Sequence, residues 1–202
     1  MQGKLFIVVG PSGVGKTTLV EAALDELRGM SLCKVVTYTT RLQREHEVNG
    51  VDYHFISVDD FCAKKAQEFF LESNFWCGNY YGSSKESVAG MQQGISYIMI
   101  LDCTGARTIG RMYEDIILIY IMPKNIEVLR ERLVRRGKEE HLAIEARINK
   151  AKQEIEQEKN ETLQHYCVIN DNFHAALKNL MKIITDAIHV ENKLSDIILK
   201  NK

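Results

Sequence analysis

Several features are scarce in this sequence, and each scarcity narrows what the protein can be. Basic and acidic residues nearly balance, and the net charge of −1 argues against a general binder of nucleic acid or membrane surfaces. No apolar run approaches the roughly 18 residues of a membrane-spanning helix. The first four residues lead directly into a core-like apolar run, without the charged and apolar regions of a secretory leader. We therefore expect a soluble protein of the cytoplasm.

Cysteine and proline are also informative by their scarcity or arrangement. The five cysteines are odd in number and scattered without C-x-x-C spacing, so the sequence predicts neither a disulfide framework nor a zinc site. There are two prolines, and no repeat, low-complexity tract or Ser/Gly linker divides the chain. The 202 residues, 45% of them apolar, are enough for a single domain, residues 1–202, with a substantial core.

The most specific motif present is Gly10-Pro-Ser-Gly-Val-Gly-Lys-Thr-Thr18, which fits G-x-x-x-x-G-K-[ST] between an apolar run and a helical periodicity. Its glycines let backbone N–H groups turn inward around a polyphosphate, and the following helix points its positive end at the same anion. Lys16 would add a charge on the β- and γ-phosphates, and the Thr17 hydroxyl would bind the accompanying Mg²⁺. The predicted nucleoside triphosphate site comprises Gly10, Pro11, Ser12, Gly13, Val14, Gly15, Lys16, Thr17 and Thr18.

Short apolar runs alternate with longer helical patterns, which is typical of an α/β fold with a mainly parallel sheet flanked by helices. Strands are predicted at 5–9, 34–37, 97–101, 116–121 and 166–169. Helices are predicted at 17–28, 85–93, 105–112, 125–136 and 173–190, and we expect a frayed polar tail after the last.

Two segments break this alternation. Residues 41–84 contain short strand-like pieces around a helical stretch, which indicates an inserted lobe rather than a βαβ crossover. Residues 137–163 are dense in lysine and glutamate at i,i+4 spacing and poor in large apolar residues, so we expect a solvated helical hairpin or lid outside the core. The predicted division is a core at about 1–37, 85–136 and 164–190, a lobe at about 38–84 and a lid at about 137–163.

The acceptor of a phosphoryl group is suggested by the lobe. Arg41 and Arg44 stand beside several hydroxyl groups, and guanidinium forks match phosphate oxygens, although a solvated basic turn would look the same. Glu72 could accept two adjacent N–H donors, which the N1 and N2 edge of guanine presents and adenine does not. A surface carboxylate at the end of a strand remains an alternative interpretation of Glu72.

Six motifs, in the same order and with nearly the same spacing, resemble guanylate kinase. They are the loop at 10–18, T-T-R-x-x-R at 39–44, G-x-D-Y-x-F at 50–55, G-N-Y-Y-G-S at 78–83, R-x-x-x-R-G at 132–137 and V-I-N-D at 168–171. The resemblance covers about residues 4–188. It implies a P-loop NTPase core, an inserted nucleoside monophosphate-binding lobe, a helical lid, and Mg²⁺-assisted transfer of the ATP γ-phosphoryl group to GMP or dGMP.

The resemblance also implies roles for individual residues. The GMP phosphate would be held by Arg41, Arg44, Tyr53 and Tyr81, and the base would be contacted by Thr37, Glu72 and Ser83. Arg132, Arg136 and Arg147 resemble arginines that close over the transferring phosphates, although each also fits a helix-surface charge. Asn170 resembles the residue next to the adenine of ATP, although a turn after a strand also explains it. The implied catalytic residues are Lys16, Arg44, Arg136 and Arg147.

One segment departs from the family. Where the family usually has L-D-x-D-x-Q-G, this chain has Leu101-Asp-Cys-Thr-Gly105, which is two residues shorter. Asp102 remains at a strand end, where α/β proteins bind ligands, and we assign it to the GMP site. The second aspartate, a guanine contact in the family, has no clear counterpart, and Thr104 is the nearest candidate. The departure bears on base selectivity more than on phosphoryl transfer.

Two other functions remain open at this point. A related kinase acting on ribose 1,5-bisphosphate shares the P-loop and lid, and the shortened segment suits it, whereas Glu72 and the motif at 50–55 suit a nucleotide. A non-catalytic guanylate kinase-like binding module would have a degraded P-loop and neighbouring interaction domains, and this sequence has neither. We expect ATP and GMP as partners, with no nucleic acid or membrane partner, and the sequence does not decide between monomer and homo-oligomer.

Overall fold

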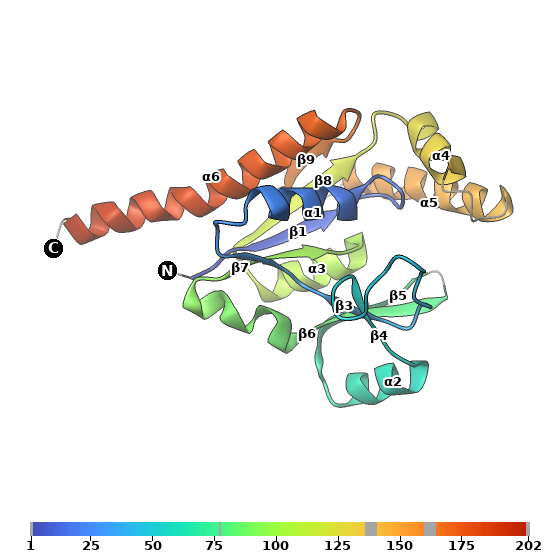
Figure 1. The fold of residues 1–202 in the computed structure, drawn as a ribbon, viewed down its shortest axis with the longest axis horizontal. Helices are drawn as coiled ribbons and strands as arrows, with labels where there is room; N and C mark the ends of the chain where they lie inside the picture. Colours follow the sequence, from blue (N-terminus) through green and yellow to red (C-terminus); the bar gives the residue numbers. More distant parts are fainter. Residues whose placement is uncertain (1, 77, 136–140, 160–164, 201–202) are drawn as a thin grey trace.

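The central feature of the fold is a parallel sheet of five strands (Figure 1). The computed structural model describes residues 2–76, 78–135, 141–159 and 165–200. The strands follow the order β2-β7-β1-β8-β9, and all neighbours are parallel. Their bounds are β1 Leu5–Val9, β2 Leu32–Lys34, β7 Ser96–Ile100, β8 Ile116–Met122 and β9 His165–Ile169. The predicted α/β class with a parallel sheet is confirmed.

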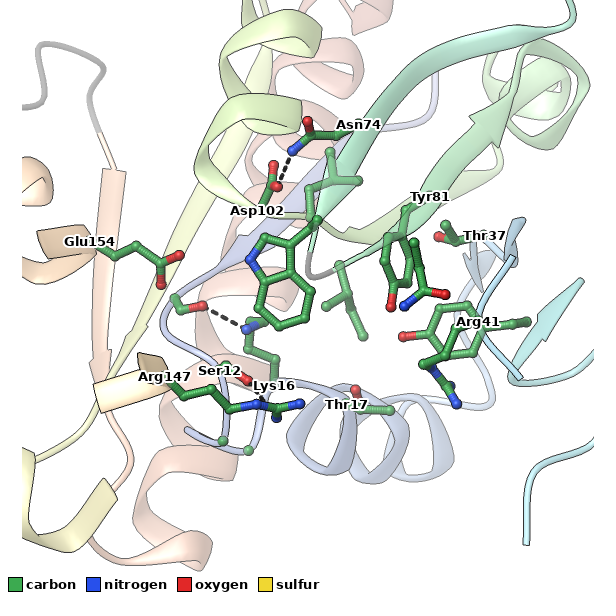
Figure 2. A pocket seen from close by; sticks show the side chains of 18 of the residues that line it. Ser12, Lys16, Thr17, Thr37, Arg41, Asn74, Tyr81, Asp102, Arg147 and Glu154 are labelled. Carbon is green, nitrogen blue, oxygen red and sulfur yellow. Dashed lines mark hydrogen bonds between the residues drawn. The ribbon is translucent and has the colours of Figure 1, made fainter. Parts of the chain in front are cut away.

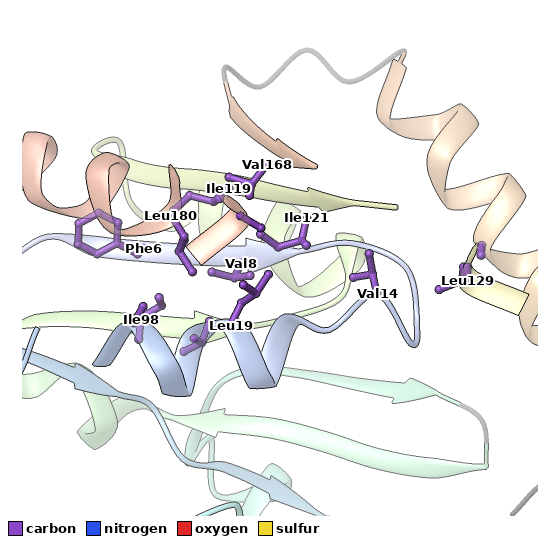
Figure 3. Packing of buried hydrophobic residues seen from close by; sticks show 14 of the residues in the cluster. Phe6, Val8, Val14, Leu19, Ile98, Ile119, Ile121, Leu129, Val168 and Leu180 are labelled. Carbon is purple, nitrogen blue, oxygen red and sulfur yellow. The ribbon is translucent and has the colours of Figure 1, made fainter. Parts of the chain in front are cut away.

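Helices cover both faces of this sheet, because alternate residues of β1 point to opposite sides. Phe6 and Val8 pack in the cluster that includes α1 (Lys16–Glu26) and α6 (Phe173–Lys200), where Figure 3 shows them near Leu19 and Leu180. Leu5, Ile7 and Val9 pack in a second cluster with α3 (Cys103–Met112) and the 3₁₀ helix η1 (Lys85–Gln93). Burial on both faces explains why these strands read as continuous apolar runs.

A second, smaller sheet forms the lobe. Its strands follow the order β4-β3-β6-β5, with bounds β3 Thr37–Thr39, β4 Tyr53–Phe55, β5 Phe70–Trp76 and β6 Asn79–Ser84. Helix α2 (Val58–Ala66) begins after Ser57, whose side chain accepts a hydrogen bond from the Asp60 amide. Phe61 of this helix is fully buried and stacks 4.4 Å from Phe70. The lobe therefore has an aromatic core of its own.

The expectation that 137–163 lies outside the core is wrong for the described part of that segment. Helix α5 (His141–Lys159) packs beside α4 (Ile126–Arg135), and its Ile144, Ile148 and Ala151 are buried in the main apolar cluster. These three side chains recur at i, i+4 and i+7, which is a narrow apolar stripe on an otherwise charged helix. In Figure 1, α4 and α5 lie near the same end of the core as the lobe.

Three further differences from the predicted elements have local causes. The predicted strand 34–37 covers the end of one strand and the start of another, because the chain leaves the core sheet after β2 and enters the lobe sheet as β3. Helix α6 continues to Lys200 instead of fraying near residue 190. Helix α3 begins at Cys103, before the predicted residue 105, because the Asp102 side chain caps it. None of the described helices is long and apolar enough to cross a membrane.

Candidate active site

The phosphate loop has the backbone that its glycines predict. Gly10, Gly13 and Gly15 have φ values of +140°, +86° and +100°, a region that other residues rarely adopt. A Cβ at Gly10 would lie 2.2 Å from the Ile121 carbonyl oxygen, so the loop begins in close contact with β8. The Lys16 Nζ donates hydrogen bonds to the carbonyl oxygens of Gly10 at 2.6 Å and Pro11 at 3.2 Å. The loop is therefore closed around its own lysine.

Most of the predicted triphosphate site lines one cleft. The residues that do so are Gly10, Ser12, Gly13, Gly15, Lys16, Thr17 and Thr18. Pro11 and Val14 belong to the loop but do not line the cleft, and Val14 is fully buried in the core. Arg147, on α5, also reaches the loop: its Nη1 lies 3.4 Å from the Ser12 hydroxyl (Figure 2).

Two residues predicted to contact ATP, Arg132 and Asn170, donate hydrogen bonds to the backbone of the loop. Arg132 donates to the carbonyl oxygens of Val14 at 3.1 Å and Asn170 at 2.8 Å. The Asn170 Nδ2 donates to the same Val14 carbonyl at 2.7 Å, and neither residue lines the cleft. Both side chains therefore hold the loop through the Val14 carbonyl group. Arg136 lies outside the described residues.

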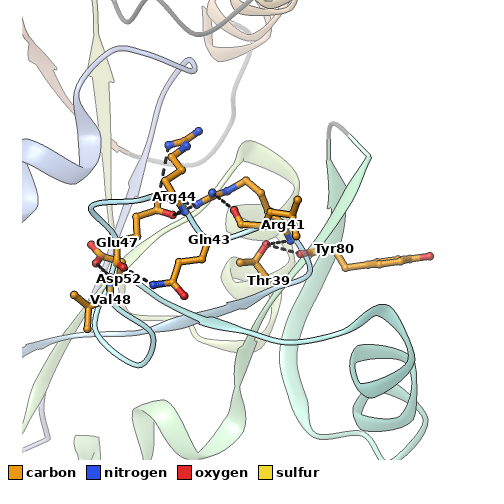
Figure 4. A network of polar contacts seen from close by, with 9 residues as sticks. Thr39, Arg41, Gln43, Arg44, Glu47, Val48, Asp52 and Tyr80 are labelled. Atoms are coloured by element: carbon orange, nitrogen blue, oxygen red, sulfur yellow. Dashed lines mark hydrogen bonds and ion pairs between the residues drawn. The ribbon is translucent and has the colours of Figure 1, made fainter.

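The predicted acceptor arginines are organised by a carboxylate that the sequence interpretation did not single out (Figure 4). Glu47, 8% exposed, receives two hydrogen bonds from the Arg41 Nη2, at 2.7 and 3.0 Å, and one from the Arg44 amide at 2.8 Å. Burial alone would raise the pKa of Glu47, but these donors hold it below its ordinary value. Glu47 thus fixes Arg41, and it also pairs with the Arg44 Nη1 at 3.7 Å, although the Arg44 side chain is 44% exposed.

Aromatic groups complete this part of the cleft. The Arg41 guanidinium lies 5.3 Å from the centre of the Tyr53 ring, and the Tyr53 and Tyr81 rings are 6.2 Å apart. Burial raises the pKa of Tyr53, with Tyr81 adding to the effect, so its phenol remains a neutral hydrogen-bond donor. Thr37, Arg41, Arg44, Tyr53 and Tyr81 all line the cleft, as the phosphate loop does.

Glu72 also lines the cleft, and its surroundings suppress its charge. Its side chain is 6% exposed, and its Oε1 accepts a hydrogen bond from the Ser83 hydroxyl at 2.8 Å. Burial raises the pKa of Glu72 to about 7, against the effect of the Ser83 hydrogen bond and with a smaller contribution from Asp102. Ser83, predicted to contact the base, is fully buried behind Glu72 and does not line the cleft.

The shortened segment after β7 brings α3 against Glu72. Asp102 accepts a hydrogen bond from the Gly105 amide at 2.8 Å through Oδ1, and its Oδ2 accepts one from the Asn74 side chain (Figure 2). A Cβ at Gly105 would lie 3.2 Å from the Glu72 Oε2, which is a tight contact. Thr104 is exposed and does not line the cleft, so the structure places Asn74, not Thr104, beside Asp102.

Sequence reasoning missed several residues that line the cleft. On β5, alternation places Asn74 and Trp76 on the same side as Glu72, and all three line the cleft. Once Glu72 is assigned to the site, this alternation predicts that Asn74 and Trp76 line it too. Glu154, on α5, lines it as well, and burial raises the pKa of its carboxyl group against the charges of Lys16 and Lys150. Its position depends on how α5 packs, which the sequence pattern did not reveal.

The cleft therefore brings cationic groups of three elements to one space. The loop supplies Lys16, the lobe supplies Arg41 and Arg44, and α5 supplies Arg147. Such an arrangement suits the transfer of an anionic group between two bound phosphates. Among the described residues no group of three or more His, Cys, Asp or Glu side chains is arranged to hold a metal ion by itself.

Comparisons with known proteins agree with this chemistry. The guanylate kinase family model matches residues 2–187. A guanylate kinase of Psychrobacter arcticus is 40% identical over 91% of this chain and 86% of its own length. One of Neisseria gonorrhoeae is 39% identical over 91% and 87%. The crystal structure of guanylate kinase from Anaplasma phagocytophilum shares the fold with a TM-score of 0.75, at 24% identity over 92% of this chain and 86% of that one. The chain belongs to the guanylate kinase family of ATP:GMP phosphotransferases.

Proposed function

We propose that this chain transfers the γ-phosphoryl group of ATP to GMP, and also to dGMP, with the phosphate loop as donor site and the lobe as acceptor site. The observation that carries the proposal is that one cleft is lined by Lys16 and Thr17 of the loop and by Arg41, Arg44 and Glu72 of the lobe. In this proposal the core binds ATP, the lobe at about 38–84 binds GMP, and the segment at about 137–163 acts as the lid.

The reaction requires alignment and charge compensation more than covalent help from the protein. The Lys16 ammonium group bonds to the Gly10 and Pro11 carbonyl oxygens, and on ATP binding it would exchange these bonds for bonds to phosphate oxygens. Arg44 of the lobe and Arg147 of α5 line the same cleft and would balance the charge of the transferring group. No strong general base is needed, because the acceptor phosphate is largely a dianion near neutral pH.

Mg²⁺ fits this cleft as an ion that arrives with ATP. The Thr17 hydroxyl lines the cleft at the start of α1 and would be the direct protein ligand. Mg²⁺ commonly takes one or two protein ligands and completes its shell with phosphate oxygens and water. When bound, the ion would reduce the negative charge of the β- and γ-phosphates.

Asn170 is the candidate partner of the donor base. Its Oδ1 is buried and is without a hydrogen-bond partner among the residues that the structure describes. An unpaired buried acceptor is costly, and the amino group of adenine is a donor that would satisfy it. Arg132 would support the donor site indirectly, through the Val14 and Asn170 carbonyl groups.

The test is ATP consumption by the purified chain, measured as ADP release with GMP, dGMP, AMP, UMP or ribose 1,5-bisphosphate as acceptor. We expect turnover with GMP and dGMP, and poor turnover with the other three. Preference for ribose 1,5-bisphosphate would overturn the assignment of GMP as acceptor and would indicate the related kinase. The shortened segment at 102–105 is the feature of this sequence that suits that kinase. No acceptor-dependent release at all would favour a binding module.

A further inference from the structure

The single tryptophan of the chain joins the lobe to α5 across the cleft. Trp76 is at the end of β5 and lines the cleft. The Arg147 guanidinium carbon lies 5.9 Å from the centre of its ring system, and the Lys150 Nζ lies 5.6 Å from it. These two cations are three residues apart on α5, so they share one side of that helix. An aromatic face attracts cations at such distances.

Arg147 is held at a second point as well. Its Nη1 lies 3.4 Å from the Ser12 hydroxyl, so the guanidinium spans the space between the phosphate loop and the indole. Arginine loses considerable rotamer freedom when it is ordered, and a flat aromatic surface reduces the number of positions that it can take. Trp76 itself is supported by Tyr81, whose ring is 6.4 Å away on the neighbouring strand.

We propose that Trp76 is a positioning residue for Arg147: the indole orders the guanidinium over the phosphate loop, so that lobe and α5 together place it on the transferring phosphates. The proposal rests on the proposed function, because it takes Arg147 as the arginine that acts on those phosphates. Lys150, on the same ring, helps to hold this side of α5 toward the lobe. Trp76 thereby acts on the rate of transfer through Arg147.

A double-mutant cycle tests this coupling. Trp76→Leu should lower kcat about 2- to 30-fold, with smaller changes in KM for ATP and GMP. Trp76→Phe should retain most of the activity, because it keeps an aromatic face. In an Arg147→Met background, Trp76→Leu should cause little further loss. Equal fold-losses in both backgrounds would overturn the proposal, since the indole would then act independently of Arg147.

The neighbouring aromatic residue provides a matched control. Phe75 is on the same strand, is 57% exposed and does not line the cleft. Phe75→Leu should leave kcat unchanged, and urea unfolding should show that each variant is folded. A loss of kcat in Phe75→Leu as large as in Trp76→Leu would mean that the strand, and not the indole, is responsible.

Fluorescence tests the contact without any turnover. Trp76 is the only tryptophan, so its emission reports on this position alone. Arg147→Met and Lys150→Met should each change the intensity or the wavelength of emission, whereas Lys182→Met, on the distant helix α6, should not. Unchanged emission in both α5 variants would overturn the proposal. An inactive wild-type protein with the expected emission changes would instead contradict the proposed function while leaving the contact established.

Discussion

The Asn74 amide donates a hydrogen bond to the Asp102 carboxylate and thereby ties strand β5 of the lobe to the end of strand β7 in the core. The other Asp102 oxygen caps α3 through the Gly105 amide at 2.8 Å. One carboxylate therefore fixes both the start of a core helix and the position of the lobe strand that carries Glu72. The shortened segment at 102–105 makes this possible, because α3 begins directly after Asp102.

The first prediction is that Asn74→Ala raises KM for GMP about 10-fold while KM for ATP changes little. A hydrogen bond to a charged group contributes roughly 1.5–3 kcal/mol, and its loss frees the lobe strand from the core. Thr104→Ala is the matched control, because Thr104 is exposed at the start of α3, the helix that Asp102 caps, and does not line the cleft. Equal rises of the two KM values in Asn74→Ala would show that the bond does not serve the acceptor site.

The second prediction concerns the loop lysine. Lys16→Ala should lower kcat by at least about 10³-fold, because it removes the charge opposite the phosphates and leaves the buried core intact. Its ammonium group donates to the Gly10 and Pro11 carbonyl oxygens of its own loop and fills no space in the apolar core, so thermal unfolding should shift little. Lys182→Ala, on α6, should retain full activity. A folded Lys16→Ala protein with most of the wild-type kcat would show that the loop does not bind the donor.

The third prediction separates the two phosphate sites. Arg44→Lys keeps a positive charge but loses the planar fork that binds two phosphate oxygens, so KM for GMP should rise far more than KM for ATP. Arg44 is suited to this test because its side chain is 44% exposed and its Nη1 lies 3.7 Å from Glu47, whereas Arg41 makes two shorter hydrogen bonds to Glu47, at 2.7 and 3.0 Å. Steady-state kinetics with each substrate varied in turn gives both constants. Equal effects on them would place Arg44 outside the acceptor site.

The sequence predicted the parts of the molecule that depend on local pattern. The loop at 10–18 needs glycines at fixed places, and β1 is buried on both faces, so both can be recognised from adjacent residues alone. The arginines of the lobe were found because they stand close together in the chain. Their partner Glu47 stands equally close, but its role depends on the turn that brings it back to Arg41.

The features that were missed depend on contacts between distant segments. Asn74 and Asp102 are 28 residues apart, and no local pattern indicates their bond. Arg132 was expected over the phosphates, and its hydrogen bonds to the Val14 and Asn170 carbonyl groups, far away in the chain, were not foreseen. The burial of Ile148 was missed because one narrow apolar stripe is masked by the surrounding charged residues.

The fourth prediction is a pH dependence that belongs to Glu72. Its pKa is about 7 in the folded protein, and only the ionised carboxylate can accept both N–H donors of guanine. The kcat/KM for GMP should therefore fall as the pH is lowered through about 7, more steeply in wild type than in Glu72→Gln. The GMP phosphate titrates in both proteins, so the ratio of their kcat/KM values isolates Glu72. A ratio that is independent of pH would contradict the assignment.

The same titration affects folding. A carboxyl group whose pKa rises from 4.5 to about 7 on folding binds its proton more tightly in the folded state. The free energy of unfolding should therefore decrease as the pH rises through this interval, and Glu72→Gln should lack that part of the decrease. Urea unfolding of both proteins at several pH values measures the difference, and identical profiles would show that Glu72 titrates normally.

The last prediction is that Glu72 selects guanine. Glu72→Gln replaces one acceptor oxygen by an N–H₂ group that faces the guanine donors, so kcat/KM for GMP should drop by about 10²-fold or more. AMP turnover, already poor, should fall much less, because adenine does not present that pair of donors. Glu47→Gln is the matched control: Glu47 organises the phosphate-binding arginines, so its loss should lower GMP and AMP turnover by a similar factor. If the ratio of GMP to AMP turnover is the same in Glu72→Gln as in wild type, selection of the base lies with other polar groups that line the cleft, and Thr37, Asn74 and Asp102 are the next to test.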